Sequence, residues 1–185
     1  MRYVRLLFLW LIGSFIFTGC SSESAEPDIA LVQAVNTNNL KAVKYFMHHS
    51  SDPNTKDKYG TPLIILAIKQ HDVAMLKLLL KSGAKVDATN EEGQTALMIA
   101  ANQDHVKAIK VLLSADADIN ATSDVGSTAL MYACFQGNER AVKMLLKKRA
   151  NVNVVNKFGD TALLSATSYG HTPIMDMLKK AGAVK

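Results

Sequence analysis

The chain has 185 residues, of which 49% are hydrophobic, 20% charged and 6% aromatic, with ten glycines and four prolines. This composition excludes a collagen-like, mucin-like or wholly disordered chain and favours one ordered domain. The two cysteines, Cys20 and Cys134, are too few for a disulfide-rich miniprotein or a four-ligand zinc site. The formal net charge of +5 is too small to imply a nucleic-acid partner by itself.

The first twenty residues have the pattern of an export signal. Arg2 and Arg5 form a basic start, the run from Leu6 to Phe17 is almost wholly apolar, and small residues follow it. As a helix that run would be about 18 Å long, against roughly 30 Å of bilayer hydrocarbon. We therefore expect a cleaved signal peptide over residues 1–19 rather than a membrane span. Its removal would lower the net charge from +5 to +3, since two arginines leave with it.

The end of this segment, Phe17-Thr18-Gly19-Cys20, resembles the bacterial lipobox, with Phe17 in place of the usual Leu. The resemblance implies that Cys20 carries acyl chains such as palmitate, which together anchor a protein stably. Residues 20–26 would then be the lipidated N-terminus and a tether. Ser21 favours the outer membrane, facing the periplasm. The alternative is an ordinary signal peptide and a soluble periplasmic product.

A sequence repeat organises the chain from residue 27 to residue 185. Glycine, alanine and leucine each recur with a period of about 33 residues, and such regular spacing is typical of stacked repeat proteins. The recurring residues are Gly60, Gly93, Gly126 and Gly159; Ala67, Ala100, Ala133 and Ala166; and Leu79, Leu112, Leu145 and Leu178. The five units are residues 27–59, 60–92, 93–125, 126–158 and 159–185.

Three stretches of the third unit resemble the signature stretches of the ankyrin repeat, and the fourth and fifth units repeat them. They are Thr95-Ala96-Leu97-Met98-Ile99-Ala100-Ala101, Val111-Leu112-Leu113 and Ala117-Asp118-Ile119-Asn120-Ala121. The resemblance implies an all-α fold, an ankyrin-repeat α-solenoid of stacked helix pairs with hairpin-like loops. It also implies one domain over residues 27–185, and we expect a monomer.

Caps and turns can be placed on this period. Thr95, Thr128 and Thr161 each precede a helical stretch and are expected to cap its first helix. In the second unit Thr61-Pro62-Leu63 lies one residue early, which predicts a shifted cap there. In two units a glycine follows the second helix, where it can end the helix in the left-handed conformation without steric cost. Where another residue takes that position, we expect the turn to cost more free energy. Those residues are Ser50, Asp116 and Arg149.

No motif arranges a nucleophile, a base and an orienting group, and there is no phosphate loop or metal-ligand spacing. We therefore expect no enzymatic activity, no bound cofactor and no metal site. His71, His105 and His171 lie at or beside the step that opens the second helix of each pair, where a structural role is expected. Cys134 occupies a small-residue position and is expected to be a buried, inert thiol.

In ankyrin-repeat proteins the loop tips and the exposed ends of the first helices line a concave surface that binds other proteins. On the matching positions of this chain, aromatic side chains are concentrated, and aromatic residues are favoured anchors of interfaces. Thr61 and Ser127 also fall on the tips. The expected partner-binding residues are Tyr59, Glu91, Glu92, Asn102, Val125, Phe135, Phe158 and Tyr169.

These features predict a non-catalytic, protein-binding scaffold of the bacterial cell envelope with no nucleic-acid partner. Resembling envelope proteins suggest two roles, toxin immunity and support of a periplasmic enzyme, and both stay open. The alternative is a structural or anionic-glycan-binding envelope lipoprotein. This alternative rests on lysines that recur at one repeat position and could bind an anionic polymer: Lys44, Lys77, Lys110 and Lys143. The other interpretation of these lysines is that they only make the outer face soluble.

Overall fold

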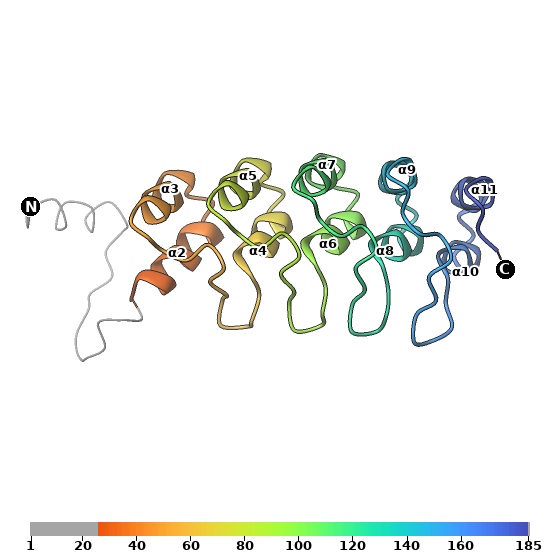
Figure 1. Cartoon of the computed structure of the whole chain (residues 1–185), viewed down its shortest axis with the longest axis horizontal. Helices are drawn as coiled ribbons and strands as arrows, with labels where there is room; N and C mark the ends of the chain where they lie inside the picture. The colour runs from red at the N-terminus through yellow and green to blue at the C-terminus, as the bar shows by residue number, and fades with distance from the viewer. Residues whose placement is uncertain (1–25, 185) are drawn as a thin grey trace, which may run out of the picture.

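The computed structural model describes residues 26–184, so the expected signal peptide and Cys20 lie outside the described residues (Figure 1). Within that range the chain forms ten helices and no strand, in five consecutive pairs. The all-α solenoid predicted from the repeat is confirmed. The pairs are α2 (Glu26–Asn36) with α3 (Leu40–His48), α4 (Leu63–Lys69) with α5 (Val73–Lys81), α6 (Ala96–Asn102) with α7 (Val106–Ser114), α8 (Ala129–Phe135) with α9 (Glu139–Lys147), and α10 (Ala162–Ser168) with α11 (Thr172–Lys180).

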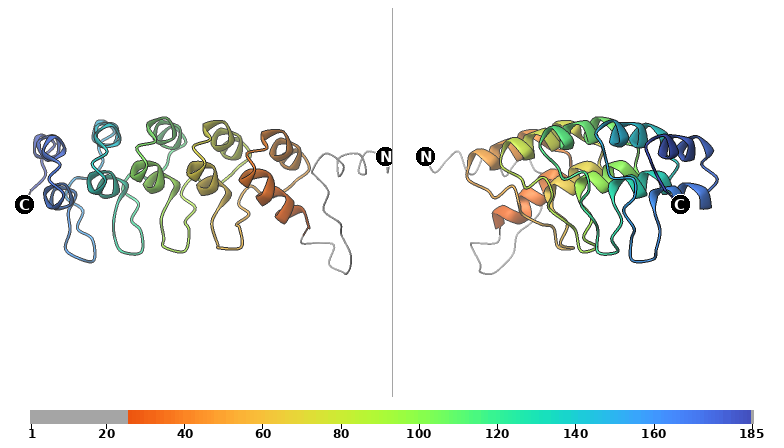
Figure 2. Two further views of the ribbon diagram at one scale, coloured as in Figure 1. Left: turned by 180° about the vertical axis from the view of Figure 1, so that it is seen from behind. Right: turned by 45° about the vertical axis from the view of Figure 1, so that its right-hand side comes forward.

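The pairs stack side by side in a single row. The second helices, α3, α5, α7, α9 and α11, form one layer, the first helices form a layer beside it, and the loops project beyond the first helices (Figures 1 and 2). In the part of the chain that the structure describes, no helix is long and apolar enough to cross a membrane.

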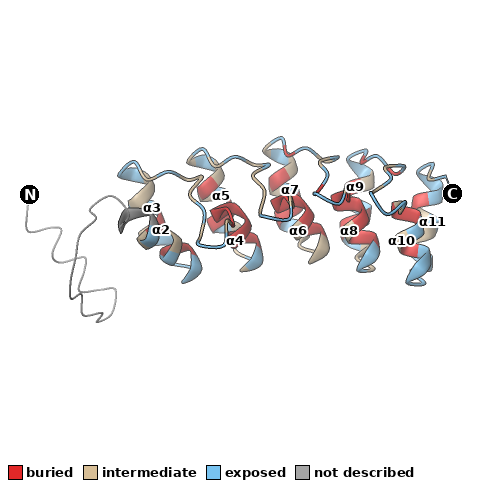
Figure 3. Cartoon of the chain, turned by 90° about the horizontal axis from the view of Figure 1, so that it is seen from below, coloured by how far each residue is buried: buried red, intermediate tan, exposed pale blue. Residues whose placement is uncertain are grey.

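The core lies between the two layers and between neighbouring pairs. Ala100, Ala133 and Ala166 are fully buried, and these small side chains let adjacent first helices approach closely. Leu112 and Leu145 are fully buried from the side of the second helices. The first helices α4, α6 and α8 are buried over most of their surface (Figure 3). Because each pair buries its apolar face against its neighbours, stability comes largely from stacking.

Three of the first helices begin with the predicted threonine cap. The hydroxyl oxygen of Thr161 accepts a hydrogen bond from the backbone N–H of Leu164 at 3.1 Å. Thr95 and Thr128 make the same bond at 3.4 Å. Each bond pairs a backbone N–H that the helix itself leaves free.

The shifted cap predicted for the second unit is wrong. Helix α4 begins at Leu63, one full repeat before the start of α6 at Ala96, so it keeps the common period. Pro62 takes the cap position without a side-chain hydrogen bond, and Thr61 is buried rather than capping. The loop fixes this register, because the backbone N–H of Asp57 donates to the oxygen of Thr61 just as Asn90 donates to Gln94 one unit later.

Left-handed turns follow both helices of each pair. The left-handed turns expected after the second helices at Ser50, Asp116 and Arg149 are confirmed, with φ angles of 64°, 59° and 62°. A second set, between the two helices of each pair, was not expected from the sequence. It takes the same repeat position in every unit and comprises Asn38, His71, Asp104, Gly137 and Gly170.

A ladder of side-chain hydrogen bonds fixes the register between units. In each case an Asn or Asp side-chain oxygen accepts the backbone N–H of the residue 31 positions later, in the next unit. These bonds satisfy loop groups that the helices cannot pair. The acceptors are Asn54, Asp87, Asn120 and Asn153, and the donors are Lys85, Asp118, Asn151 and Val184.

Candidate partner-binding surface

The four loop tips between units are closed in the same way. At each tip a backbone N–H donates to the carbonyl oxygen four residues later, as in a hairpin. The side chain of the first residue then accepts hydrogen bonds from inside the tip. For example, Asn156 Oδ1 accepts from the N–H groups of Phe158 and Asp160, both at 2.9 Å. The residues that close the tips are Asp57, Asn90, Ser123 and Asn156.

Sequence reasoning missed these closing residues, although the signal was present. They recur with the same period as the glycines, and Asp, Asn and Ser are the residues that favour this kind of turn. The closing residues also determine which side chains the tips expose. Because the apex residue of three tips donates its backbone N–H to the closing side chain, its own side chain is held outward.

The apex positions form a row along the solenoid, which we call the tip strip: Tyr59, Glu92, Val125 and Phe158. Phe158 is 72% exposed, Tyr59 64% and Val125 37%, so three of the four apices present apolar surface to solvent. Glu91 is also exposed, and its side chain lies beside Gly60 of the preceding tip.

Neighbouring tips are joined by main-chain hydrogen bonds. The N–H of Asp124 donates to the carbonyl oxygen of Glu92 at 3.1 Å, and the N–H of Lys157 donates to that of Val125 at 2.9 Å. These bonds link the second, third and fourth tips into one continuous element. The part of the tip strip from Glu92 to Phe158 is therefore held together by its own backbone bonds, and a preformed surface lowers the entropic cost of association.

A second group lies at the ends of the first helices. Phe135 is the last residue of α8, and Tyr169 follows α10 directly. Their rings meet edge to face with centroids 4.5 Å apart, yet Phe135 stays 44% and Tyr169 55% exposed. His171 completes the cluster, because its Nε2 lies 3.2 Å from the carbonyl oxygen of Phe135.

Other expected contact residues lie in less open places. Asn102 is half-buried, and its carbonyl oxygen accepts a hydrogen bond from the Asn138 side chain at 2.8 Å. Thr61 and Ser127, which the sequence also places on the tips, are buried. The structure thus gives two groups, the tip strip and the Phe135–Tyr169 pair.

The titratable groups of the described residues form no evident reactive or metal-binding site. Burial raises the pKa of the Cys134 thiol to about 12, so it stays protonated near neutral pH and is a poor nucleophile. Burial, followed by the positive charges of His71 and Lys107, lowers the pKa of His105. Within residues 26–184 no group of three or more His, Cys, Asp or Glu side chains converges as metal ligands would.

The repeat architecture and its paired loop tips define the class of protein. A family model described as ankyrin repeats (3 copies) matches residues 31–123 and 118–185. The chain therefore belongs to the ankyrin-repeat family, whose members generally act as interaction scaffolds for other proteins. No curated protein matches the chain in a sequence comparison.

Proposed function

We propose that this protein is a non-catalytic scaffold of the bacterial cell envelope that binds one partner protein through the tip strip and the Phe135–Tyr169 pair. The observation that carries the proposal is the exposure of aromatic rings on parts of the solenoid that hydrogen bonds hold in place. Rigid aromatic side chains bury a large area on binding and lose little conformational freedom.

The proposed location rests on the sequence of the first twenty residues. A signal peptide over residues 1–19 and a lipid on Cys20 would place the solenoid in the periplasm, held to the outer membrane by its N-terminus. There it would inhibit, shield or position its partner, either as immunity to a toxin or as support of a periplasmic enzyme.

A crosslinking pull-down from envelope extract tests the proposed surface. Residues 26–185, which contain the whole described core, serve as the bait, and the captured proteins are quantified by mass spectrometry. We expect the Phe135→Ala, Tyr169→Ala double variant to lose at least about tenfold of its capture, since two interface anchors are removed. Helical content by circular dichroism should be unchanged.

The matched control is Tyr45→Ala, which removes an exposed aromatic ring from the opposite layer, on α3. Capture should survive this change, and equal loss in both variants would contradict the proposed surface. Capture should also persist at about 500 mM salt, because an apolar interface is little screened. Loss at that salt would favour the anionic-glycan alternative.

Membrane fractionation tests the location separately. After membranes are washed at about 500 mM salt, which screens charge-based contacts, Cys20→Ser should move the full-length protein to the soluble periplasmic fraction, because no acyl chain can then be attached. A variant that stays with the membrane would show that lipid on Cys20 is not the anchor.

A further inference from the structure

The layer of second helices is strongly basic, and nothing in the partner-binding surface accounts for it. The five helices of this layer carry eleven basic and two acidic side chains. All eleven basic side chains are exposed. We call them the basic row: Lys41, Lys44, Lys77, Lys81, Lys107, Lys110, Arg140, Lys143, Lys147, Lys179 and Lys180.

Most of the basic row has no acidic neighbour to pair with. Among the described residues two ion pairs form, Arg140 with Asp104 at 3.6 Å and Lys143 with Glu139 at 3.4 Å. Helices α3, α5 and α7 contain no acidic residue. Like charges three or four residues apart disfavour a helix slightly, so this pattern does not stabilise the fold.

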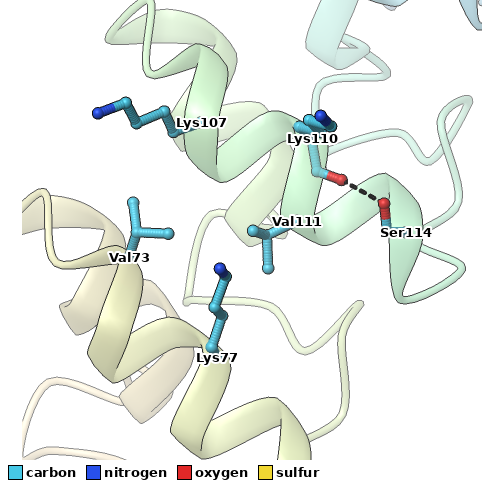
Figure 4. Close-up of a pocket in the computed structure, with 6 residues that line it drawn as sticks. All are labelled: Val73, Lys77, Lys107, Lys110, Val111 and Ser114. Atoms are coloured by element: carbon cyan, nitrogen blue, oxygen red, sulfur yellow. Dashed lines mark hydrogen bonds between the residues drawn. The ribbon is translucent and has the colours of Figure 1, made fainter.

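The groove between α5 and α7 shows what the layer offers a ligand (Figure 4). Val73 and Val111 line a shallow depression of about 460 Å³, with Lys77, Lys107 and Lys110 around it. The ammonium groups stand on long flexible stems beside a small apolar floor, and in Figure 4 Lys77 extends toward the two valines whereas Lys107 extends away from Val111. Such a surface suits mobile anionic groups better than a rigid, shape-matched protein.

The layer of second helices also exposes few large hydrophobic side chains, which argues against a protein partner on this face. Of the large hydrophobic side chains that are exposed, two lie on the second helices, Leu40 and Tyr45, both on α3. The others lie on the first helices, the loop tips or the chain end. A protein interface of this length would be expected to carry central aromatic anchors, and the remaining four second helices have none.

The charge is also spread evenly rather than focused. Each of the five second helices contributes two or three basic side chains, and the helices lie side by side in one layer (Figure 2). A broad target with many equivalent negative charges matches this distribution. Of the acidic residues in the loops, five lie at the tips: Asp57, Glu91, Glu92, Asp124 and Asp160. Asp72, Asp104 and Asp116 lie instead in turns next to the second helices.

We propose that the basic row docks the solenoid on an anionic phospholipid surface, with the loops and the tip strip facing away. Binding is electrostatic and peripheral, without insertion, because the layer lacks apolar anchors beyond α3. The interaction requires neither lipid on Cys20 nor the partner protein, so it stands or falls independently of the proposed function.

The test measures binding of residues 26–185 to vesicles by co-sedimentation. Vesicles of phosphatidylethanolamine with about 30 mol% phosphatidylglycerol should bind the protein at low salt, whereas pure phosphatidylcholine vesicles should not. Changing Lys44, Lys77, Lys107 and Lys110 to Gln should lower the partition coefficient roughly 100-fold or more, since each charge near the surface contributes separately.

The matched control changes four exposed lysines off the layer, Lys58, Lys69, Lys85 and Lys157, to Gln, which gives the same net charge. This control should retain most of the vesicle binding. Equal loss in the two variants would show that net charge rather than the basic row is responsible. Absent binding to anionic vesicles, or binding to anionic polysaccharide but not to vesicles, would overturn the proposal.

Discussion

The ring of Tyr169 meets the ring of Phe135 edge to face, with the centroids 4.5 Å apart and the planes at 64°. Phe135 ends α8 and Tyr169 follows α10, so this contact joins the fourth unit to the fifth. The His171 ring is nearly parallel to the Tyr169 ring, with a centroid distance of 6.3 Å. The pair therefore has a structural role as well as an exposed face.

We predict measurable coupling between Phe135 and Tyr169 in the free energy of unfolding. Each single change to Ala should destabilise the chain by about 1 kcal/mol, and the double change should cost less than the sum by about 0.5 kcal/mol. The expected values are small because both rings are half exposed. Urea unfolding of the four proteins of the cycle measures the coupling, and strict additivity would show that the ring contact contributes nothing.

A second prediction concerns the left-handed turn after α9. Arg149 has a φ of 62°, a conformation that costs any residue with a Cβ about 1 to 2 kcal/mol. Arg149→Gly should therefore raise the free energy of unfolding by about 0.5 to 1 kcal/mol, after allowing for the extra freedom that glycine gives the unfolded chain. The hydrogen bond from the N–H of residue 149 to Leu146, at 2.9 Å, is kept.

The neighbouring residue supplies the control for this turn. Lys148 has an ordinary φ of −92°, so glycine there relieves no strain. Lys148→Gly should lower the free energy of unfolding by up to about 1 kcal/mol. If both variants were destabilised alike, the cost assigned to the left-handed residue would be wrong.

A third prediction ranks the loss of stability caused by alanine at the glycines of three loop tips. A Cβ on Gly93 would stand 2.7 Å from the backbone nitrogen of Asp124, whereas one on Gly126 would be 3.2 Å from the Cα of Asn156. A Cβ on Gly159 meets nothing within 4 Å, although all three φ angles are positive. Alanine should thus cost about 3 kcal/mol or more at Gly93, less at Gly126 and about 1 kcal/mol at Gly159.

Thermal or urea unfolding of the three alanine variants tests this order. The Gly159 variant serves as the control, since it isolates the cost of the backbone conformation from the cost of the contact. Similar losses at all three positions would mean that the tips do not approach each other as closely as the bond between Asp124 and Glu92 indicates.

The period of the sequence repeat allowed much of the fold to be predicted. It placed the helix pairs, the threonine caps and the left-handed turns at Ser50, Asp116 and Arg149, because each depends on local sequence repeated in every unit. The cap of α4 was mispredicted for the opposite reason. There Thr61-Pro62-Leu63 looks like a shifted signature, but the hairpin-like loop and the stacked core hold the common register.

The arrangement of the surface was harder to predict. Tyr59, Val125 and Phe158 were named as separate contact residues, but the hydrogen bonds that join neighbouring tips depend on the spacing between stacked units. Phe135 and Tyr169 do not occupy equivalent positions of their units, so their contact breaks the repeat and no periodic pattern indicates it. Cys134 was simpler, because its small-residue position already indicated burial, and it is fully buried.

The last prediction concerns the pH dependence of stability. The pKa of His105 is lowered from 6.5, first by burial and then by the positive charges of His71 and Lys107. Nδ1 of His105 is buried and has no hydrogen-bond partner among the described residues, so a proton there would place charge on an unpaired atom. The centroid of the His71 ring lies 4.9 Å from that of the His105 ring.

Because the folded pKa lies below the unfolded one, the unfolded chain takes up a proton first as the pH falls. The free energy of unfolding should therefore decrease below pH 6.5 and level off once the folded chain is also protonated. Since solvent still reaches the ring, we expect roughly 0.5 kcal/mol or less. His105→Asn should flatten this part of the curve, and Asn is compatible because Asn138 caps α9 at the same repeat position.

His71→Asn should flatten the curve only partly, since it removes a positive charge but leaves the burial of His105 unchanged. Urea midpoints of the three proteins between pH 8 and pH 5 measure the difference, and the histidines common to all three cancel from the comparison. Parallel curves for the unchanged protein and His105→Asn would contradict the lowered pKa. A full loss of the dependence in His71→Asn would instead make charge repulsion, rather than burial, the main cause.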